Sequence, residues 1–412
     1  MRVVCGLIIS SLICVAPAVA QPRLTMDWPA MAERLVAQLD PQPGERILLL
    51  ARPGNFDDIL PHLRYALMEA GAVDLGVVDV LEEPFPEAWD AEVLRRGYAE
   101  ARAAYKEMFR DVDGAIMMPG ARAGQPAYSA LQDWLNEDVG RTIHFHWTQN
   151  GSAFPIPGQP LPGQTAIDAH YQRALLETDY EALAAKQREF VQVMRGADVR
   201  VTSPIGTDIS FRIGDRPVNL QDGDASKART DQGVILIDRE IELPAGSIRV
   251  APLEETVNGV VAFPHSQWDG RPVIGLRITF ERGRIVGVTA DSGLDAVQAE
   301  LDGAPAQARA FREFALGFNP LLAVPDRNPW IPYYGYGEGV VRLSLGDNSE
   351  LGGTVTGGYV RWNFFTDTTV RLDDEVWVRA GRLVHLGARH TRGVTLRAGN
   401  GSRPASGRSK GL

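Results

Sequence analysis

Short apolar runs that alternate with helix-like stretches restrict the fold of the N-terminal half more than any other feature. Residues 46–51, 73–80 and 114–118 form apolar runs of strand length, the first of them between two Pro-Gly pairs. Residues 56–70 repeat Ile and Leu at helical spacing, and residues 91–110 have the alanine and charge content of a helix. Because strands that alternate with helices pair in parallel, this order predicts a parallel α/β sheet.

Strand signals dominate the second half of the chain. Amphipathic spacing predicts one long helix over residues 171–196 and another over 294–314. Most of the remaining segments predict strands, at 199–202, 209–213, 233–237, 247–251, 260–263, 273–280 and 284–290, with short strands between 339 and 386.

These patterns predict two domains of different class. We expect an N-terminal α/β domain over residues 21–165 and a mostly β, α+β domain over residues 166–395, which would carry the site. Residues 150–164 are rich in Gly and Pro, which is typical of a link or a long loop. Residues 396–412 have the small and polar composition of a disordered tail.

Residues 1–20 have the pattern of an export signal. Arg2 supplies a positive charge, residues 3–15 are almost wholly apolar, and Ala-Val-Ala at 18–20 precedes Gln21. The apolar run is too short for an ordinary membrane span. We therefore expect the signal to be removed and the mature protein to be periplasmic or secreted, without a membrane span.

Two further features of the composition exclude classes of function. Cys5 and Cys14 are the only cysteines of the 412 residues, and both would leave with the signal. The mature protein would then have neither a catalytic cysteine nor a zinc–thiolate site. A formal net charge of −10 argues against a nucleic-acid or anionic-membrane partner.

A series of short motifs in the second half resembles a known family. The motifs are Leu-Pro-Ala-Gly-Ser-Ile at 243–248, Arg-Glu-Phe-Ala-Leu-Gly at 312–317, Val-Arg-Leu-Ser-Leu-Gly at 341–346 and Val-Arg-Trp-Asn-Phe at 360–364. Together they resemble the aminopeptidase T / aminopeptidase S family of metallopeptidases. The resemblance covers most of the mature chain and implies the family's fold and a site for two metal ions.

The resemblance also implies five metal-ligand positions, of which this chain keeps one family residue. The family has two Glu, two His and one Asp there, and the corresponding residues here are Ser247, Glu313, Arg342, Arg361 and Asn363. A divalent cation needs carboxylate or neutral imidazole, whereas a guanidinium group stays protonated and has no lone pair. We therefore expect the two-metal site to be largely lost, and the sequence leaves the cofactor unknown.

Two interpretations of these residues remain open. Glu313 could still be a metal ligand and the catalytic residue, or it could form a structural salt bridge with Arg342 or Arg361. The two arginines, with Asn363 and Ser247, could bind an anionic ligand, or they could lie on solvent-facing strand positions. The fold is also similar to that of dihydroxypyridine dioxygenases, but the His-x-Asp iron ligands of those enzymes are absent at Arg361 and Asn363.

Other residues are weaker candidates. His144 and His146 would share one face of a strand and could meet one metal, although such pairs are common without a metal. His265, Glu254 and Glu255 could be substitute ligands or general bases near the site.

An aromatic segment precedes the Arg342 motif. Residues 328–336 read Asn-Pro-Trp-Ile-Pro-Tyr-Tyr-Gly-Tyr, and they could form the lip of a binding site or pack on the core.

The sequence thus predicts an exported aminopeptidase T-like protein. It would act on or bind a peptide or small-molecule ligand, such as an amino-acid-type compound, and this ligand could be anionic. The alternatives are a non-catalytic binding protein that holds an anion through Arg342 and Arg361, or a partner-binding pseudoenzyme. A homodimer is compatible with all three interpretations.

Overall fold

The computed structural model describes residues 25–81, 85–122, 124–137, 140–147 and 154–384. The predicted signal, both cysteines and the predicted tail lie outside these residues. Within them, no helix is both long enough and apolar enough to cross a bilayer.

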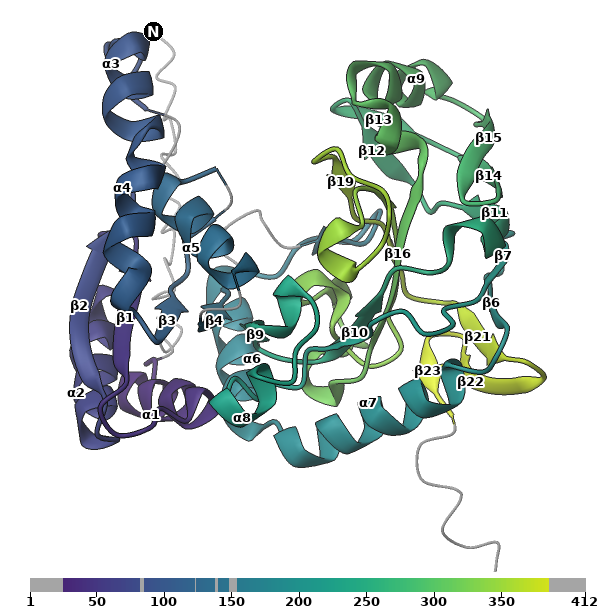
Figure 1. Ribbon diagram of the computed structural model, residues 1–412. Helices are drawn as coiled ribbons and strands as arrows, with labels where there is room; N and C mark the ends of the chain where they lie inside the picture. The colour runs from purple at the N-terminus through teal and green to yellow at the C-terminus, as the bar shows by residue number, and fades with distance from the viewer. Residues whose placement is uncertain (1–24, 82–84, 123, 138–139, 148–153, 385–412) are drawn as a thin grey trace, which may run out of the picture.

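A five-stranded parallel sheet forms the N-terminal part, as the sequence predicted (Figure 1). Its strand order is β2-β1-β3-β4-β9. The strands are β1 (Arg46–Ala51), β2 (Val73–Asp79), β3 (Gly114–Met117), β4 (Arg141–Phe145) and β9 (Glu240–Leu243). One face of the sheet packs against α1 (Trp28–Leu39) and α2 (Leu60–Glu69). The other face packs against α5 (Pro126–Asn136) and the end of α4 (Ala101–Met108).

The last strand of this sheet comes from far along the chain. Strand β9 lies beyond the predicted boundary at residue 165, yet it pairs in parallel with β4. The pairing sets Glu240 beside Thr142 and Glu242 beside His144 in the register. Acidic side chains from the second half of the chain are thereby brought to the histidines of the first half.

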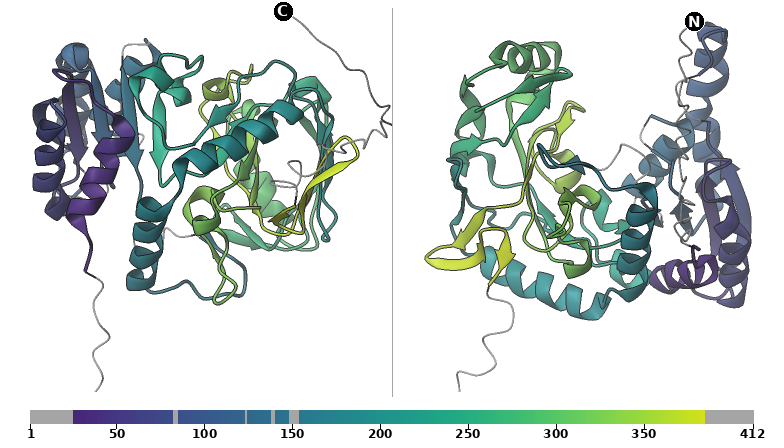
Figure 2. Two further views of the ribbon diagram at one scale, coloured as in Figure 1. Left: turned by 90° about the horizontal axis from the view of Figure 1, so that it is seen from below. Right: turned by 180° about the vertical axis from the view of Figure 1, so that it is seen from behind.

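The C-terminal part consists mainly of two antiparallel sheets, which confirms the predicted change to mostly β structure (Figure 2). A six-stranded sheet contains β8 (Asn219–Leu220), β10 (Ser247–Val250), β16 (Phe311–Gly317), β18 (Val341–Gly346), β19 (Val360–Arg361) and β20 (Phe364–Phe365). An eight-stranded sheet follows the order β15-β14-β11-β7-β6-β21-β22-β23. Its strands are β6 (Val199–Thr202), β7 (Asp208–Phe211), β11 (Asn258–Ala262), β14 (Arg277–Glu281), β15 (Arg284–Thr289), β21 (Thr369–Leu372), β22 (Glu375–Arg379) and β23 (Arg382–Leu383).

Shorter elements complete the described structure. The helices are α3 (Ala91–Leu94), which continues through a π-helical turn (Arg95–Ala99) into α4, and α8 (Lys227–Thr230). Two small ribbons pair β12 (Ser266–Trp268) with β13 (Arg271–Val273), and β5 (Phe154–Pro155) with β17 (Trp330–Ile331).

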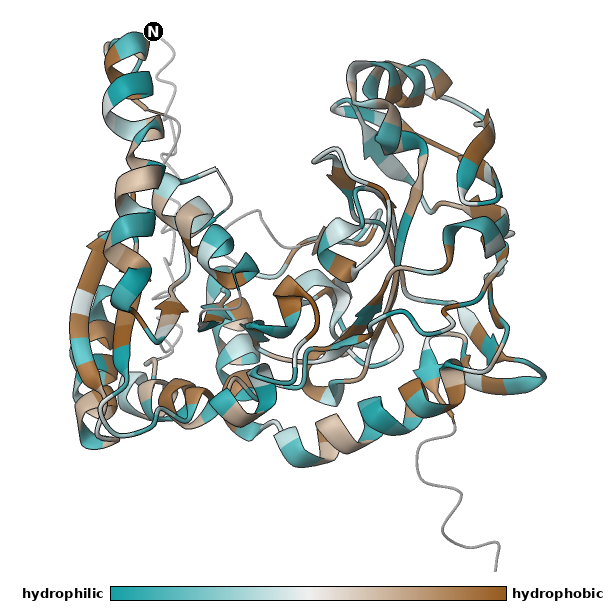
Figure 3. Cartoon of the chain, viewed as in Figure 1, coloured by the Kyte–Doolittle hydropathy of each residue, from teal (hydrophilic) through white to brown (hydrophobic). Residues whose placement is uncertain are grey.

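The predicted helix over residues 171–196 is in fact two helices. The first, α6 (Gln164–Glu177), ends before Thr178, and the second, α7 (Tyr180–Met194), begins after Asp179. The Asp179 carboxylate accepts a hydrogen bond from the backbone N–H of Ala182, which is the usual cap of a new helix. Along α7, hydrophilic and hydrophobic bands alternate in Figure 3, as expected for a helix with one face on the core.

Two other predicted elements were also wrong. The helix predicted over residues 294–314 is α9 (Leu294–Gly303), because Pro305 follows its end and cannot continue it. Glu313 therefore lies in the middle of strand β16 rather than at a helix end. The strand predicted at residues 233–237 does not form, and a short 3-10 helix (Leu236–Asp238) leads into β9 instead.

Candidate functional site

One face of the six-stranded sheet carries charged side chains although all its central strands are buried. The register sets Arg249 of β10 and Arg342 of β18 on either side of Ala315, and it sets Glu313 beside Ser344. Residues that pair directly across antiparallel strands point to the same face of a sheet. Their neighbours along the strands are apolar and belong to the core, namely Ile248, Val250, Phe314, Leu316, Leu343 and Leu345. The face opposite the core is thus built from the charged residues.

Three guanidinium groups surround the carboxylate of Glu313, whose side chain is 0% exposed. Arg342 Nε donates to Oε1 at 2.5 Å, and Arg249 Nη2 donates to Oε2 at 3.2 Å. Arg312 Nε lies 3.4 Å from Oε2. Of the partners that the sequence analysis left open for Glu313, the structure shows a salt bridge with Arg342, together with two arginines that the sequence analysis missed.

A second carboxylate completes the group. Glu350 Oε1 accepts from Arg249 Nη2 at 2.6 Å and also from Arg312 Nη2. We call Arg249, Arg312, Glu313, Arg342 and Glu350 the arginine–glutamate cluster. The cluster contains three arginines and two glutamates, and its formal net charge is therefore +1.

The cluster keeps Glu313 ionised. Burial by itself raises the pKa of this carboxyl, but the nearby charges of Arg342, Arg249 and Arg312 outweigh burial and lower the pKa to about 2. The pKa of Glu350 is also lowered, because Arg312 and Arg249 offset its burial. Glu313 is therefore an anion with its lone pairs directed at guanidinium groups, and it is unsuited to accept a proton near neutral pH.

Several buried polar atoms in this region have no hydrogen-bond partner within the described part of the chain. They include Ser247 Oγ, Arg249 Nε, Arg312 Nε and Arg342 Nη2. Ser247 lies on β10 two residues before Arg249, and its backbone carbonyl accepts a hydrogen bond from the backbone N–H of Gln221 at 2.8 Å.

Arg361 and Asn363 have other partners. Arg361 lies opposite Leu345 in the register, on the other face of the sheet from Glu313. Its Nη1 donates to Glu300 Oε1 at 2.5 Å, and its guanidinium carbon lies 3.5 Å from the centre of the Trp268 ring. Asn363 Nδ2 donates to the Leu343 carbonyl at 3.1 Å. The structure thus does not bring Arg361 to Glu313, nor does it join Arg342 and Arg361 in one anion clamp.

His144 and His146 lie together, as the strand pattern predicted. Their ring centroids are 3.6 Å apart. His144 Nδ1 is 3.2 Å from Glu240 Oε1, whereas His146 Nε2 has no partner among the described residues. Burial, followed by the charge of His144, lowers the pKa of His146 well below its usual range. Within the described ranges, no group of three or more His, Cys, Asp or Glu side chains could hold a metal ion.

The aromatic segment connects the histidines to the arginine–glutamate cluster. Tyr333 OH donates to Glu242 Oε2 at 3.2 Å, and Tyr336 OH donates to the same oxygen. The Tyr334 carbonyl accepts from Arg342 Nη1 at 3.2 Å. Tyr333 and Tyr334 adopt positive φ angles of 28° and 45°, which only tertiary contacts could hold for such bulky residues. The segment therefore mainly packs on the core, although Ile331 also lines a cavity.

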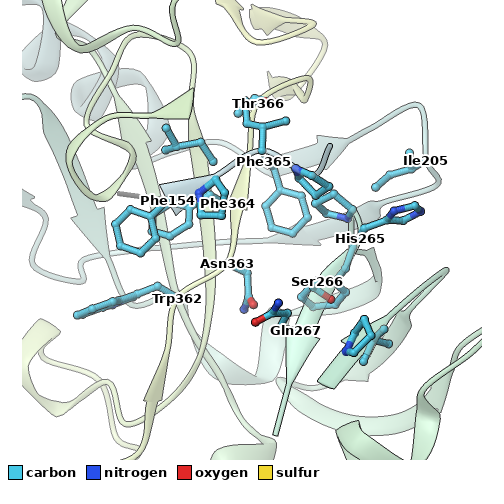
Figure 4. Close-up of a pocket in the computed structure, with 18 of the residues that line it drawn as sticks. Phe154, Ile205, His265, Ser266, Gln267, Trp362, Asn363, Phe364, Phe365 and Thr366 are labelled. Atoms are coloured by element: carbon cyan, nitrogen blue, oxygen red, sulfur yellow. The ribbon is translucent and has the colours of Figure 1, made fainter. Parts of the chain in front are cut away.

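A cavity of about 660 Å³ lies beside β19 and β20 (Figure 4). Arg361, Asn363 and His265 are among its lining residues, and His265 is exposed at its edge. The other two weaker candidates lie elsewhere. Glu254 accepts from Asn348 Nδ2 at 3.0 Å and also pairs with Arg216, so it is a structural anchor. Glu255 is exposed.

Charged residues within otherwise apolar strand sequences were the signal that could have revealed Arg249 and Arg312. Arg249 follows Ile248 in Ser-Ile-Arg-Val, and Arg312 precedes Glu313 in Phe-Arg-Glu-Phe. A buried arginine needs a carboxylate partner, so an arginine at each of these positions predicts a nearby Glu. The identity of that Glu depended on strand register, which the sequence alone did not supply.

Comparison with known proteins finds a family match for one segment of the chain and two solved structures with a similar fold. Residues 177–321 match the family model described as thermophilic metalloprotease (M29). The segment includes β10 with Ser247 and β16 with Glu313. The resemblance to the aminopeptidase T / aminopeptidase S family is thereby confirmed for this part of the chain. A search of curated proteins found no match.

Two solved structures share the fold. AmpT from Thermus thermophilus is 18% identical with a TM-score of 0.58, and the match covers 86% of this chain and 99% of AmpT. The 2,5-dihydroxypyridine dioxygenase from Pseudomonas putida KT2440 is 15% identical with a TM-score of 0.58, over 87% of this chain and 97% of that enzyme. Together with the family match, the likeness to AmpT supports an aminopeptidase-like hydrolase as the relative of this chain.

Proposed function

For a chain whose segment 177–321 matches the thermophilic metalloproteases, we propose an exported aminopeptidase-fold protein that binds its ligand without two-metal hydrolysis. The ligand would be a peptide or a small molecule, such as an amino-acid-type compound. The observation that carries the proposal is the enclosure of Glu313 by Arg249, Arg312 and Arg342.

The physical reason is competition for the same carboxylate. A divalent ion at Glu313 would need its lone pairs, which already accept from two guanidinium groups. The ion would also stand within a few ångströms of three fixed positive charges that cannot be deprotonated. The neighbouring positions of the family's ligand set offer a serine hydroxyl and an amide, which bind such ions poorly.

The geometry favours a ligand held outside the two arginines over an anion held by Arg342 and Arg361. Arg342 and Arg361 already have carboxylate partners, Glu313 and Glu300. A ligand anion would have to displace a buried ion pair rather than meet a free cation. The cavity beside β19 and β20 is lined mostly by apolar side chains, so it would receive an apolar or aromatic part of the ligand rather than its charged groups.

Metal analysis and a peptidase assay test this proposal together. The purified mature protein is incubated with Zn²⁺, Co²⁺ or Mn²⁺, dialysed and analysed by mass spectrometry of the elements, with AmpT prepared in the same way as the positive control. We expect no stoichiometric metal and no metal-dependent release of p-nitroaniline from leucine p-nitroanilide. Two tightly held ions per chain, or activity that returns with metal, would show that the proposal is wrong.

A further inference from the structure

The cavity of about 660 Å³ has walls that come from six separate parts of the chain, at residues 154–157, 205, 263–267, 272–274, 331 and 361–367. Phe154 belongs to β5, Phe263 follows β11 and Ile331 belongs to β17, whereas Trp362 and Asn363 connect β19 to Phe364 and Phe365 of β20. In Figure 4, Phe154 and Phe364 lie together on one side, and their ring centroids are 4.5 Å apart. We propose that this cavity binds an uncharged aromatic small molecule.

The size of the cavity and the exposure of its walls support a small-molecule ligand. Ligand pockets in proteins usually enclose about 300–1,000 Å³ and have mostly apolar walls. Three large apolar residues of the wall, Trp362, Ile274 and Ile205, are 40%, 42% and 39% exposed. Apolar side chains that remain exposed around one hollow mark a site where a ligand can remove them from water.

The aromatic character follows from the ring-rich side of the cavity. Trp362 lies against Tyr334 at 5.1 Å between ring centroids, and Phe365 lies 5.9 Å from Phe263. Both contacts hold the rings in place, so that a planar ligand could pack on them with little loss of side-chain entropy.

The charges argue for an uncharged ligand. Arg361 lines the cavity, but its guanidinium group is paired with Glu300 and packed on the Trp268 ring. The other fully charged lining residue is Asp367, which is exposed. An anion in the cavity would therefore find no uncompensated cation among the described lining residues, and it would lose its hydration.

Two amides provide directional polar contacts. Asn363 and Gln267 line the cavity, and their amide ends point toward one another in Figure 4. Asn363 Nδ2 is engaged by backbone carbonyls. An uncharged ligand with one hydroxyl or ring N–H could use these amides without bringing a charge into the cavity.

A matched pair of fluorescent probes tests the proposal on the mature protein. N-phenyl-1-naphthylamine is uncharged, whereas 1-anilinonaphthalene-8-sulfonate has the same rings and a sulfonate. We expect saturable binding of the uncharged probe to one site per chain, weaker binding of the sulfonate, and displacement of the uncharged probe by indole but not by cyclohexanol.

Two substitutions in the wall of the cavity and one control substitution locate the site. Ile205→Glu places a carboxylate in the wall and should weaken binding of the uncharged probe at least about tenfold. Val286→Glu makes the same change at a 55% exposed residue of β15, away from the cavity, and should leave binding unchanged. Trp362→Ala should also weaken binding, with its unfolding curve recorded because Trp362 packs near Arg342.

Several outcomes would overturn the inference. They are the absence of saturable binding, equal binding by the Ile205→Glu variant, equal displacement by cyclohexanol, and tighter binding of the sulfonate that is lost in Arg361→Gln. The inference is independent of the metal question. A metal-loaded protein that binds the uncharged probe would contradict only the proposed function, and a metal-free protein that does not bind it would contradict only this inference.

Discussion

At the scale of single residues, the carboxylate of Glu313 lies among the guanidinium groups of the arginine–glutamate cluster. The family resemblance implies that Glu313 is the one retained ligand position and that Arg342 replaces a histidine of the family. A buried carboxylate without a counter-charge would be costly. In this chain guanidinium groups supply that counter-charge, so that the glutamate stabilises the fold whether or not the protein has a ligand.

Removing the carboxylate should destabilise the protein. In Glu313→Ala, three buried guanidinium groups would keep only Glu350 as a counter-charge, which should cost about 3–5 kcal/mol of unfolding free energy. Urea unfolding monitored by circular dichroism measures the loss. Glu281→Ala, at an exposed glutamate of β14, is the control and should change stability little. Equal stability of the two variants would show that the cluster is solvated and open.

The pH dependence of stability should reveal the same carboxyl group. Its pKa falls from 4.5 to about 2 in the folded protein, so its contribution is complete above pH 4.5 and is lost as the pH falls toward 2. Glu313→Gln keeps the shape but cannot titrate. We therefore expect the stability difference between the wild type and Glu313→Gln to shrink across this window in pH-dependent unfolding curves. A constant difference across the window would contradict the assignment.

At the scale of elements, the end of strand β16 and the aromatic segment at residues 328–336 hold each other in position. Tyr336 and Tyr333 bind Glu242 of β9, and Tyr334 binds Arg342 of β18. Hydrogen bonds thereby join the aromatic segment to the parallel sheet on one side and to the antiparallel sheet on the other. This junction requires the backbone of Gly317 to approach the segment closely.

A methyl group at Gly317 should disturb this junction. An added Cβ would lie 2.0 Å from the Gly337 carbonyl oxygen and 2.7 Å from that of Gly335, both of which are backbone atoms. Gly317→Ala should therefore cost about 1–3 kcal/mol, as overpacking usually does. Gly303→Ala at the end of α9 has open space and should be neutral in the same thermal unfolding assay. Unchanged stability of Gly317→Ala would mean that the junction adjusts freely.

At the scale of the whole molecule, the proposed export signal predicts that the mature protein is periplasmic or secreted. The signal pattern in residues 1–20 predicts cleavage before Gln21, and the described chain begins its first helix shortly afterwards, at Trp28. N-terminal sequencing of protein from the periplasmic or medium fraction should give a start near Gln21. An intact Met1 on protein from the cytoplasmic fraction would disprove it.

The sequence by itself determined the classes of structure, and the family resemblance led us to expect that the metal site is lost. Local apolar runs and helical spacing indicated the parallel sheet and the later antiparallel strands, because these periodicities depend on neighbours along the chain. The residue types at Arg342, Arg361 and Asn363 predicted a poor set of metal ligands, and this stays a prediction that the proposed metal analysis tests. The family resemblance also led us to expect that Glu313 could pair with Arg342 or Arg361, and the structure shows the pair with Arg342.

Only the tertiary structure decided which side chains share the site. Arg249 lies 64 residues before Glu313 along the chain, and it reaches the carboxylate because β10 and β16 are neighbours in one register. Arg361 lies near Arg342 in sequence, yet its strand position turns it to the opposite face, toward Glu300. A shift of one residue in register would reverse either outcome. The physical reason is that the direction of a side chain alternates along its own strand, whereas its contact partner depends on how strands that are distant in the chain pair with one another.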